Sequence, residues 1–204
     1  MQPFRDHRGI AVPFEEQNVD TDQIIPSRFL LKPRAFDHGA LLFHDLRQET
    51  SDVEPFVLDR PAYRGASIIV GNENFGCGSS REQAAYALYD YGIRVVIAPS
   101  FGDIFRVNCV KNGLLPATVD YPTASTLRQK ARNQPGIRLT VNLKDMSIGD
   151  DSQQSYRFMI DHGMRDQLLS GEDELSRTQK LQQSIDDFEH QWERAVSWAK
   201  PNRE

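Results

Sequence analysis

Short apolar runs mark the middle of the chain as two buried strands with a helix between them. Residues 67–70 and 95–98 are dominated by apolar side chains without alternation, as expected for strands buried on both faces of a sheet. A glycine-rich loop follows the first run, and the next residues are apolar at helical spacing up to Gly92, a residue type that commonly ends helices. This order of strand, loop, helix and strand predicts a βαβ unit with parallel strands.

Alternating patterns outside this unit predict further strands. Residues 9–14 are typical of a short strand closed by Pro13. Apolar and polar residues alternate over 137–144 and again over 156–160, with a turn expected at 149–151. Strict alternation predicts antiparallel strands with one solvent-exposed face. The chain should therefore form a mixed α/β fold.

Two segments have other patterns. Residues 27–50 show no clean period and are expected to form a long irregular loop with room for a helical turn, and such loops in compact domains are often functional. The C-terminal residues predict an amphipathic helix. Its apolar stripe consists of Leu181, Ile185, Phe188, Trp192 and Ala195. We expect this stripe to pack in a core rather than to form a partner-binding face.

Composition and charge exclude several classes of protein. The 204 residues are 39% hydrophobic and 26% charged, and no apolar run approaches the roughly 20 residues that a membrane helix requires. The first residues lack the apolar stretch of a secretory signal, so we expect a cytoplasmic protein without a membrane partner. The net charge is −5 without a Lys/Arg block, which argues against nucleic-acid binding.

The cysteines and histidines predict no metal site in this chain. Cys77 and Cys109 are the only cysteines, too few for a disulfide framework, a four-thiolate zinc site or a complete iron–sulfur site. The five histidines show no metal-ligand spacing.

Residues 74–83, Asn-Phe-Gly-Cys-Gly-Ser-Ser-Arg-Glu-Gln, carry the strongest chemical signal. Gly76 and Gly78 allow a close backbone approach to a ligand. The helix that follows directs free N–H groups and its positive dipole end at this loop, an arrangement that binds anions. We expect Ser79 to cap this helix and Glu82 to complete a capping box.

The loop lacks the sequence patterns of known nucleotide-binding loops, which limits the kinds of anion that it could bind. The third glycine of a dinucleotide-binding loop is replaced by Arg81, and no Gly-Lys-Ser/Thr of a P-loop follows. A guanidinium can grip a carboxylate through two hydrogen bonds, so a small carboxylate is favoured. The loop alone is equally compatible with a purely structural role, in which Ser79 only caps the helix and Cys77 only packs.

Four segments in order along the chain form a combination far more specific than any one of them. They are residues 18–26 (Asn-Val-Asp-Thr-Asp-Gln-Ile-Ile-Pro), 74–82, 96–105 and 112–116. Together they resemble the small subunits of 3-isopropylmalate dehydratase, in the aconitase superfamily. The resemblance implies a single swivelling β/β/α domain of the aconitase type over residues 1–204, with a mixed sheet, the βαβ unit and residues 172–204 as a helical C-terminal extension.

The resemblance also implies an activity and a partner. The reaction is that of a hydro-lyase, which isomerises 2-isopropylmalate to 3-isopropylmalate by dehydration and rehydration in leucine biosynthesis. A separate large subunit is implied, without which this chain is inactive. Three cysteines of that subunit hold a 4Fe-4S cluster whose open iron binds the small dicarboxylate substrate. The cysteine count agrees, because this chain cannot hold the cluster alone.

Site residues are implied position by position. Ser79 matches the serine base that removes the carbon-bound proton, and Asp22 matches a buried acid that positions or polarises it. The substrate-binding positions are Thr21, Ser80, Arg81 and, as a weaker match, Arg34. The loop over residues 27–43 matches the region that reads the substrate's side group. Phe29, Leu30 and Leu31 there are expected either to present an apolar wall to an isopropyl group or to pack in the core.

The chain departs from the family pattern at two places. Residues 83–86 are Gln-Ala-Ala-Tyr where His-Ala-Pro-Trp is usual, and residues 162–163 are His-Gly in place of Pro-Phe. Gln83 forms hydrogen bonds but cannot take a proton near neutral pH. Two alternatives therefore stay open. One is a hydro-lyase for another substituted malate such as citramalate, and the other is a non-catalytic carboxylate-binding paralogue.

Overall fold

The computed structural model describes residues 1–49, 55–152, 154–196 and 198, and it divides into two compact units. The first unit is Met1–Gly171 and the second is Glu172–Glu204. The first contains every strand of the described residues, and the second contains two helices.

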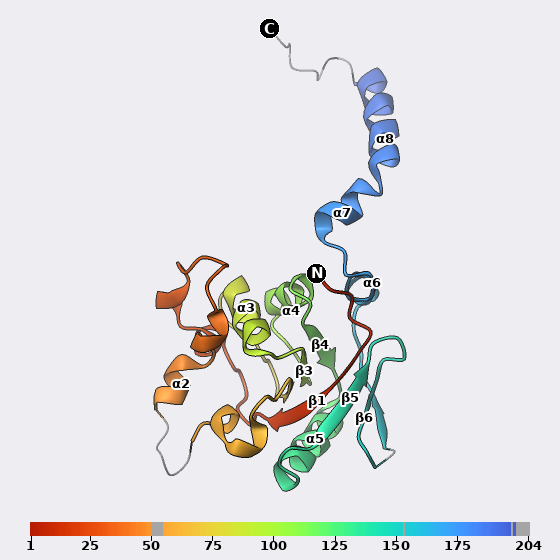
Figure 1. Ribbon diagram of the computed structural model, residues 1–204. Helices are drawn as coiled ribbons and strands as arrows, with labels where there is room; N and C mark the ends of the chain where they lie inside the picture. Colours follow the sequence, from red (N-terminus) through yellow and green to blue (C-terminus); the bar gives the residue numbers. More distant parts are fainter. Residues whose placement is uncertain (50–54, 153, 197, 199–204) are drawn as a thin grey trace. The chain divides into compact units, whose positions relative to one another are not determined.

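A mixed sheet organises the first unit (Figure 1). Its strands in chain order are β1 (Asp6–Pro13), β2 (Ile68–Val70), β3 (Val95–Ala98), β4 (Leu115–Thr118), β5 (Arg138–Asn142), β6 (Ser147–Gly149) and β7 (Ser155–Arg157). The spatial order is β4-β3-β2-β1-β5-β6-β7, with parallel pairing from β1 to β4 and antiparallel pairing from β1 through β5 to β7. This confirms the mixed fold, the parallel βαβ unit and the antiparallel strands. The first strand begins earlier than residue 9, and the last ends before residue 160.

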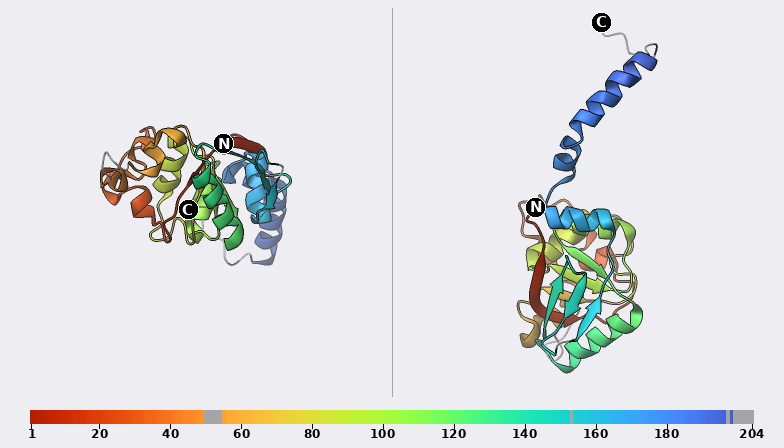
Figure 2. Two further views of the ribbon diagram at one scale, coloured as in Figure 1. Left: turned by 90° about the horizontal axis from the view of Figure 1, so that it is seen from below. Right: turned by 90° about the vertical axis from the view of Figure 1, so that its right-hand side faces the viewer.

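The sheet curls until its two edges meet. β1 bends strongly along its length (Figure 2). Thr118, at the end of β4, forms an isolated antiparallel bridge with Met159, which follows β7. The two residues exchange backbone hydrogen bonds of 3.1 and 2.7 Å. One edge of the sheet is therefore paired with the other at this point.

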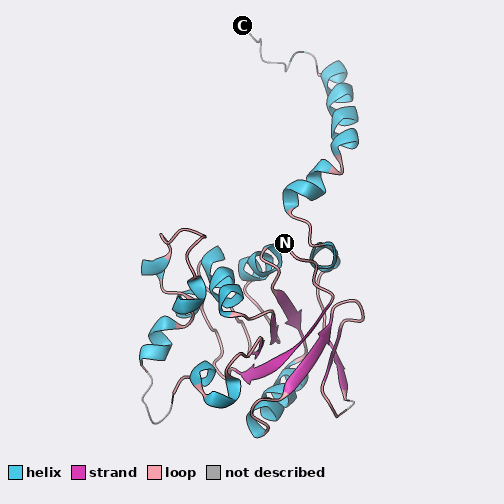
Figure 3. Ribbon diagram, viewed as in Figure 1, coloured by secondary structure: helices cyan, strands magenta, loops and turns pink. Residues whose placement is uncertain are grey.

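Helices cover both faces of the parallel strands (Figure 3). In the first unit they are α1 (Thr21–Ile24), α2 (His44–Gln48), α3 (Glu82–Tyr91), α4 (Asp103–Lys111), α5 (Tyr121–Asn133) and α6 (His162–Ser170). Ile69 of β2 lies in one core cluster with side chains of α3 and α4, whereas Ile68 and Val70 lie in a second cluster with side chains of α5. Successive strand residues point to opposite faces, so each face carries its own core.

Residues 27–50, expected to be an irregular loop, contain short helical turns in their described part. Besides α2 they are the 3₁₀ turns η1 (Ser27–Phe29) and η2 (His38–Leu41). Two more 3₁₀ turns, η3 (Val57–Asp59) and η4 (Pro61–Tyr63), precede β2. Each turn is too short to show a periodic pattern, which explains why the sequence indicates a loop with room for one helical turn and not the several turns present.

The second unit contains α7 (Glu174–Gln179) and α8 (Gln182–Ala195). The predicted amphipathic helix is present as α8, but its own unit does not bury its apolar stripe, and the packing of this stripe in a core stays a prediction. None of its residues is buried, and Phe188 is 65% exposed. In the part of the chain that the structure describes, no helix has the length and apolarity needed to cross a membrane.

Candidate active site

The glycine-rich loop between β2 and α3 is held by close backbone packing. Gly76 has φ +74°, and a Cβ there would lie 2.2 Å from Cγ of Phe105. A Cβ on Gly102 would lie 2.3 Å from the carbonyl oxygen of Gly76. The backbone N–H of Asn74 donates to Oγ of Ser100 over 2.8 Å. Only glycine fits at both contact positions, so the loop after β2 and the loop after β3 support each other.

The Asp-Thr-Asp motif is joined to this loop although nearly 60 residues separate them. The Gly76 N–H donates to the carbonyl of Val19 over 2.7 Å, and the Thr21 N–H donates to the carbonyl of Cys77 over 2.9 Å. The buried Thr21 hydroxyl donates to the carbonyl of Ser79 over 2.8 Å. Thr21, predicted to bind substrate, thus fixes the backbone of the predicted base.

Helix α3 begins later than expected, which corrects the capping prediction. Its N-cap residue is Arg81, no side chain caps it, and neither Ser79 nor Glu82 forms a capping box. Gly78 has φ +87° and Arg81 is extended, so the chain reaches the helix two residues after Ser79. Ser79 and Ser80 are both exposed. The Ser79 hydroxyl is therefore available to a ligand instead of to the helix terminus.

Arg81 and Asp22 form the charged part of the site. The Arg81 guanidinium donates from Nη1 to Oδ1 of Asp22 over 2.6 Å, and the backbone N–H of Ser27 donates to the same oxygen over 2.7 Å. The Arg81 side chain is only 14% exposed, whereas that of Asp22 is 52% exposed. The expectation that Asp22 is a buried acid is thus wrong. It stands at the surface and orients a largely shielded guanidinium.

The remaining predicted residues lie at the end of η1 and on the segment that follows it. Arg34 forms a two-bond ion pair with Asp90 of α3, at 2.9 and 3.0 Å, and its guanidinium carbon lies 4.3 Å from the Tyr86 ring centroid. Phe29 and Leu30 are partly buried against the first core cluster, whereas Leu31 is 98% exposed. Core packing thus accounts for two members of the expected apolar wall but not for Leu31.

Two residues of α3 that sequence reasoning did not assign to the site hold this segment. Asp90 accepts the bonds from Arg34, and Gln83 donates from Nε2 to the carbonyl of Leu30 over 3.3 Å. In the sequence, Gln83 stands out only as a departure from the family pattern. Asp90 lies four residues after Tyr86, on the same face of α3, and that spacing is a signal that could have connected it with Arg34.

A cavity of about 410 Å³ beside the site bears on where an anion binds. It is lined by Asn18, Asp20, Asp22, Gln23, Asp45, Leu46 and Glu49. Its carboxylates repel a dicarboxylate, so this hollow does not suit such a ligand. The anion site predicted at Ser79 and Arg81 is therefore not provided by this cavity and stays a prediction.

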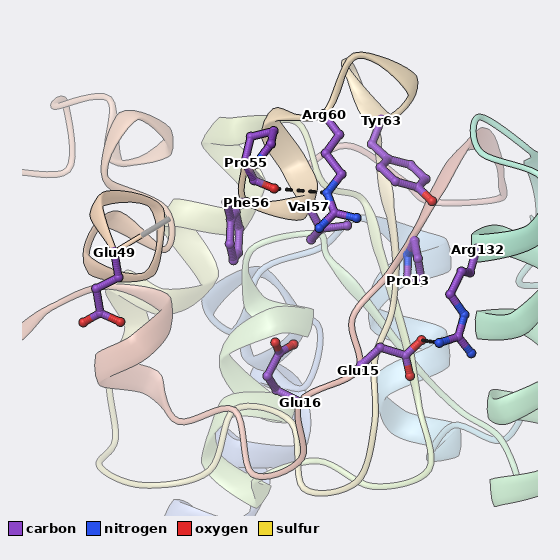
Figure 4. A pocket seen from close by; sticks show the side chains of 10 residues that line it. All are labelled: Pro13, Glu15, Glu16, Glu49, Pro55, Phe56, Val57, Arg60, Tyr63 and Arg132. Atoms are coloured by element: carbon purple, nitrogen blue, oxygen red, sulfur yellow. Dashed lines mark hydrogen bonds and ion pairs between the residues drawn. The ribbon is translucent and has the colours of Figure 1, made fainter. Parts of the chain in front are cut away.

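A separate cavity of about 500 Å³ lies away from the predicted residues (Figure 4). It is lined by Pro13, Glu15, Glu16, Glu49, Pro55, Phe56, Val57, Arg60, Tyr63 and Arg132. Among its lining residues, Arg132 pairs with Glu15 at 3.5 Å, and Arg60 donates to the carbonyl of Pro55 over 3.0 Å. None of the predicted site residues lines this cavity.

The two thiols do not fit an iron–sulfur cluster. Cys109 is fully buried in the first core cluster. Cys77 donates its thiol to the carbonyl of Asn18 over 3.3 Å, and burial together with the nearby Asp20 charge raises its pKa. A cluster ligand must be a thiolate, which this setting disfavours. Among the described residues, no three His, Cys, Asp or Glu side chains form a group that could hold a metal ion.

Comparison with known proteins gives concordant matches. The family model described as the aconitase C-terminal domain matches residues 1–122. The 3-isopropylmalate dehydratase small subunit of Bacillus licheniformis is 44% identical over 193 residues, which are 94% of this chain and 96% of that protein. The one from Bacillus subtilis is 43% identical over 194 residues, with the same coverage of 94% and 96%.

A solved structure of similar fold comes from Methanocaldococcus jannaschii. It is a crystal structure of 3-isopropylmalate dehydratase with a TM-score of 0.65 and 26% sequence identity. The match covers 89% of this chain and 99% of that chain.

Proposed function

Because the chain belongs to the family of 3-isopropylmalate dehydratase small subunits, we propose that residues 18–22 and 74–81 are its part of the active site, with Ser79 as the base. The expected family, fold class and activity are confirmed. The activity is that of the hydro-lyase EC 4.2.1.33, which isomerises 2-isopropylmalate to 3-isopropylmalate in leucine biosynthesis.

The observation that carries the site assignment is the double connection between the two motifs. Thr21 holds the carbonyl of Ser79 at 2.8 Å, and Asp22 holds the guanidinium of Arg81 at 2.6 Å. The backbone of Ser79 and the side chain of Arg81 are thereby both held by the Asp-Thr-Asp motif, just before the start of α3. A shielded cation and a helix N-terminus both stabilise negative charge on a neighbouring oxygen.

This arrangement defines a role for each side chain. The Ser79 alkoxide takes the carbon-bound proton of the substrate during dehydration and returns a proton during hydration. Ser80 and Arg81 bind a substrate carboxylate through hydrogen bonds, the latter with a charge-assisted bond. Asp22 orients Arg81, and Thr21 positions Ser79.

The name "small subunit" carried by the relatives implies a large-subunit partner. We propose that this partner holds the 4Fe-4S cluster, which supplies the Lewis acid of the reaction. The buried Cys109 and the protonated Cys77 support this division of labour. Both cysteines are free thiols, which fits a reducing compartment such as the cytoplasm.

The alternatives raised by Gln83 have less support. Its amide donates a hydrogen bond to the Leu30 carbonyl, a structural contact for which no ionisation is required. The departure from the family pattern is therefore compatible with an intact catalytic loop, and a non-catalytic paralogue is not needed to explain it.

The test is Ser79→Ala in the complex reconstituted with the large subunit and its cluster. We expect turnover of 2-isopropylmalate to fall by about 10²- to 10⁴-fold, since this is what positioned acid–base groups contribute. Ser155→Ala is the matched control, because Ser155 is an exposed serine of β7 outside the site. Size-exclusion chromatography should show intact assembly for both variants. Wild-type turnover by Ser79→Ala would refute the assignment of the base.

A further inference from the structure

Residues 30–39 are attached to helix α3 at two places, one near the start of the helix and one near its end. Near the start of the helix, Gln83 donates to the carbonyl of Leu30 over 3.3 Å. Near its end, Asp90 accepts two hydrogen bonds from the Arg34 guanidinium. The same carboxylate accepts the backbone N–H of His38 over 3.2 Å. One aspartate thus fixes a side chain and a backbone group of the segment.

The attachment is close, and although the Arg34 side chain is 48% exposed, the Asp90 and His38 side chains that hold the segment are shielded from water. A Cβ on Gly39 would lie 2.4 Å from the backbone nitrogen of Tyr91, so η2 rests directly on the last turn of α3. His38 is fully buried, with its ring 5.5 Å from that of Tyr86. Asp90 is 16% exposed. An ion pair with such a partner is screened less than a fully exposed pair.

Between its two attachments the segment carries the exposed apolar side chain of Leu31, which we call the apolar tip. Leu31 directly follows the Leu30 carbonyl that Gln83 holds, and its side chain is 98% exposed. The same helix begins at Glu82, immediately after the loop that carries Ser79 and Arg81. Helix α3 therefore sets the distance between the loop that carries the base and the apolar tip.

We propose that Asp90 is a positioning residue for substrate selection, acting through Arg34 and His38 on the placement of Phe29–Leu31. This inference rests on the proposed function, together with the expectation from the family resemblance that these residues face the substrate's side group. Asp90 does not touch substrate. It decides whether the apolar tip stands where an isopropyl group can contact it.

The test compares two ligands in the reconstituted complex. Asp90→Asn removes the negative charge from the ion pair with Arg34. We expect the KM for 2-isopropylmalate to rise about tenfold, which is the size of effect that the loss of one or two apolar contacts produces. The Ki of 2-methylmalate as a competitor should stay within about twofold, because a methyl group is too short to reach the tip. Asp151→Asn is the matched control. It breaks another two-bond pair, with Arg8, outside this segment.

If Asp90→Asn is poorly folded, a second variant and a direct measurement of segment mobility still test the proposal. Gln83→Met removes the other attachment and should shift the KM in the same direction. Hydrogen exchange of the amides of residues 30–39 should become faster in both variants, while that of β2 is unchanged.

Equal losses for both ligands, or an unchanged ratio of KM to Ki in both variants, would overturn the proposal. Failure of the proposed function is a different result. In that case the wild-type complex would not convert 2-isopropylmalate, or Ser79→Ala would remain active.

Discussion

Individual charged residues of the site are paired within the chain. Arg81 bonds to Asp22, Arg34 to Asp90, and Arg28 to Asp45. These pairs leave little uncompensated positive charge on the segments that carry the predicted residues. An approaching dicarboxylate therefore meets a few oriented hydrogen-bond donors and not a broad positive patch. Recognition of the dicarboxylate should then depend more on the geometry of these hydrogen bonds than on long-range electrostatic attraction.

The thiol of Cys77 gives a prediction at the same scale. Burial, and secondly the Asp20 charge, raise its pKa above the ordinary value of about 9. Because the thiolate is the reactive form, Ellman's reagent should react slowly with the native chain at pH 7 and faster as the pH rises past 9. Asp20→Asn should accelerate the reaction, and asparagine still caps α1. Cys77→Ser should remove the reaction altogether, since Cys109 is fully buried. Reaction as fast as that of a small free thiol at pH 7 would contradict this account.

At the scale of single residues, the members of the site could be predicted where a sequence motif identifies them. Their exposure and capping roles could not be predicted, because these depend on backbone geometry. The residues of the two motifs could be singled out, and Thr21 with Asp22 indeed meets Ser79 with Arg81. The capping role of Ser79 could not be excluded, because it depends on the positive φ of Gly78 and the extended Arg81. The exposure of Asp22 depends on packing that no local pattern encodes.

Among the elements, the antiparallel half of the sheet is fastened to α5 by one ion pair. Lys130 of α5 donates to Asp150 over 2.6 Å, in the turn after β6. The backbone N–H of Ser152 donates to the same carboxyl group over 2.9 Å. Bonding to Lys130, with that to Ser152, lowers the pKa of Asp150 to about 2.

Asp150→Asn should therefore lower the free energy of unfolding at pH 7 by about 1 kcal/mol, since it removes a charge-assisted hydrogen bond. The folded-state pKa lies below the ordinary 3.8, so the unfolded chain binds the proton more tightly. The stabilisation is complete above about pH 5 and disappears as the pH falls toward 2. Urea unfolding of wild type and variant across this range measures it. A difference that stays constant down to pH 2 would show that the carboxylate charge is not responsible.

Elements with a strong period were predictable, and those held by distant contacts were not. The apolar runs of β2 and β3 and the alternation of β5 are intrinsic to their own residues. The turns η2 and α2 exist because other parts of the chain hold them. The Phe43 N–H donates to the Ile24 carbonyl over 2.8 Å, and Gly39 fits against Tyr91. Such contacts leave no periodic trace in the sequence.

At the scale of the whole molecule, both hydrophobic core clusters found among the described residues lie in the first unit. Neither core cluster contains a residue of α7 or α8. The amphipathic stripe of α8 could be read from the sequence, but its exposure could not, because periodicity gives the face of a helix and not what lies against it.

Truncation after Gly171 should therefore leave a folded protein. We expect its thermal midpoint to lie within about 4 °C of that of the full chain, the shift that about 1 kcal/mol produces at this size. Circular dichroism melting of both proteins measures this. Substitution of Phe188 by Ser in the full chain is the companion variant, and its midpoint should also be unchanged. A truncated chain that is unfolded at 25 °C would show that residues 172–204 complete the fold.

The bridge between Thr118 and Met159 has a consequence for handling the isolated chain. An open sheet offers unpaired edge strands on which other chains can add, a common route to fibrils and precipitation. Here the last residue of one edge strand is already bonded to the segment that follows the opposite edge. At this point each sheet edge satisfies backbone hydrogen-bonding groups of the other. Concentrated solutions of the isolated chain should therefore resist aggregation by edge-strand addition, even without the partner subunit.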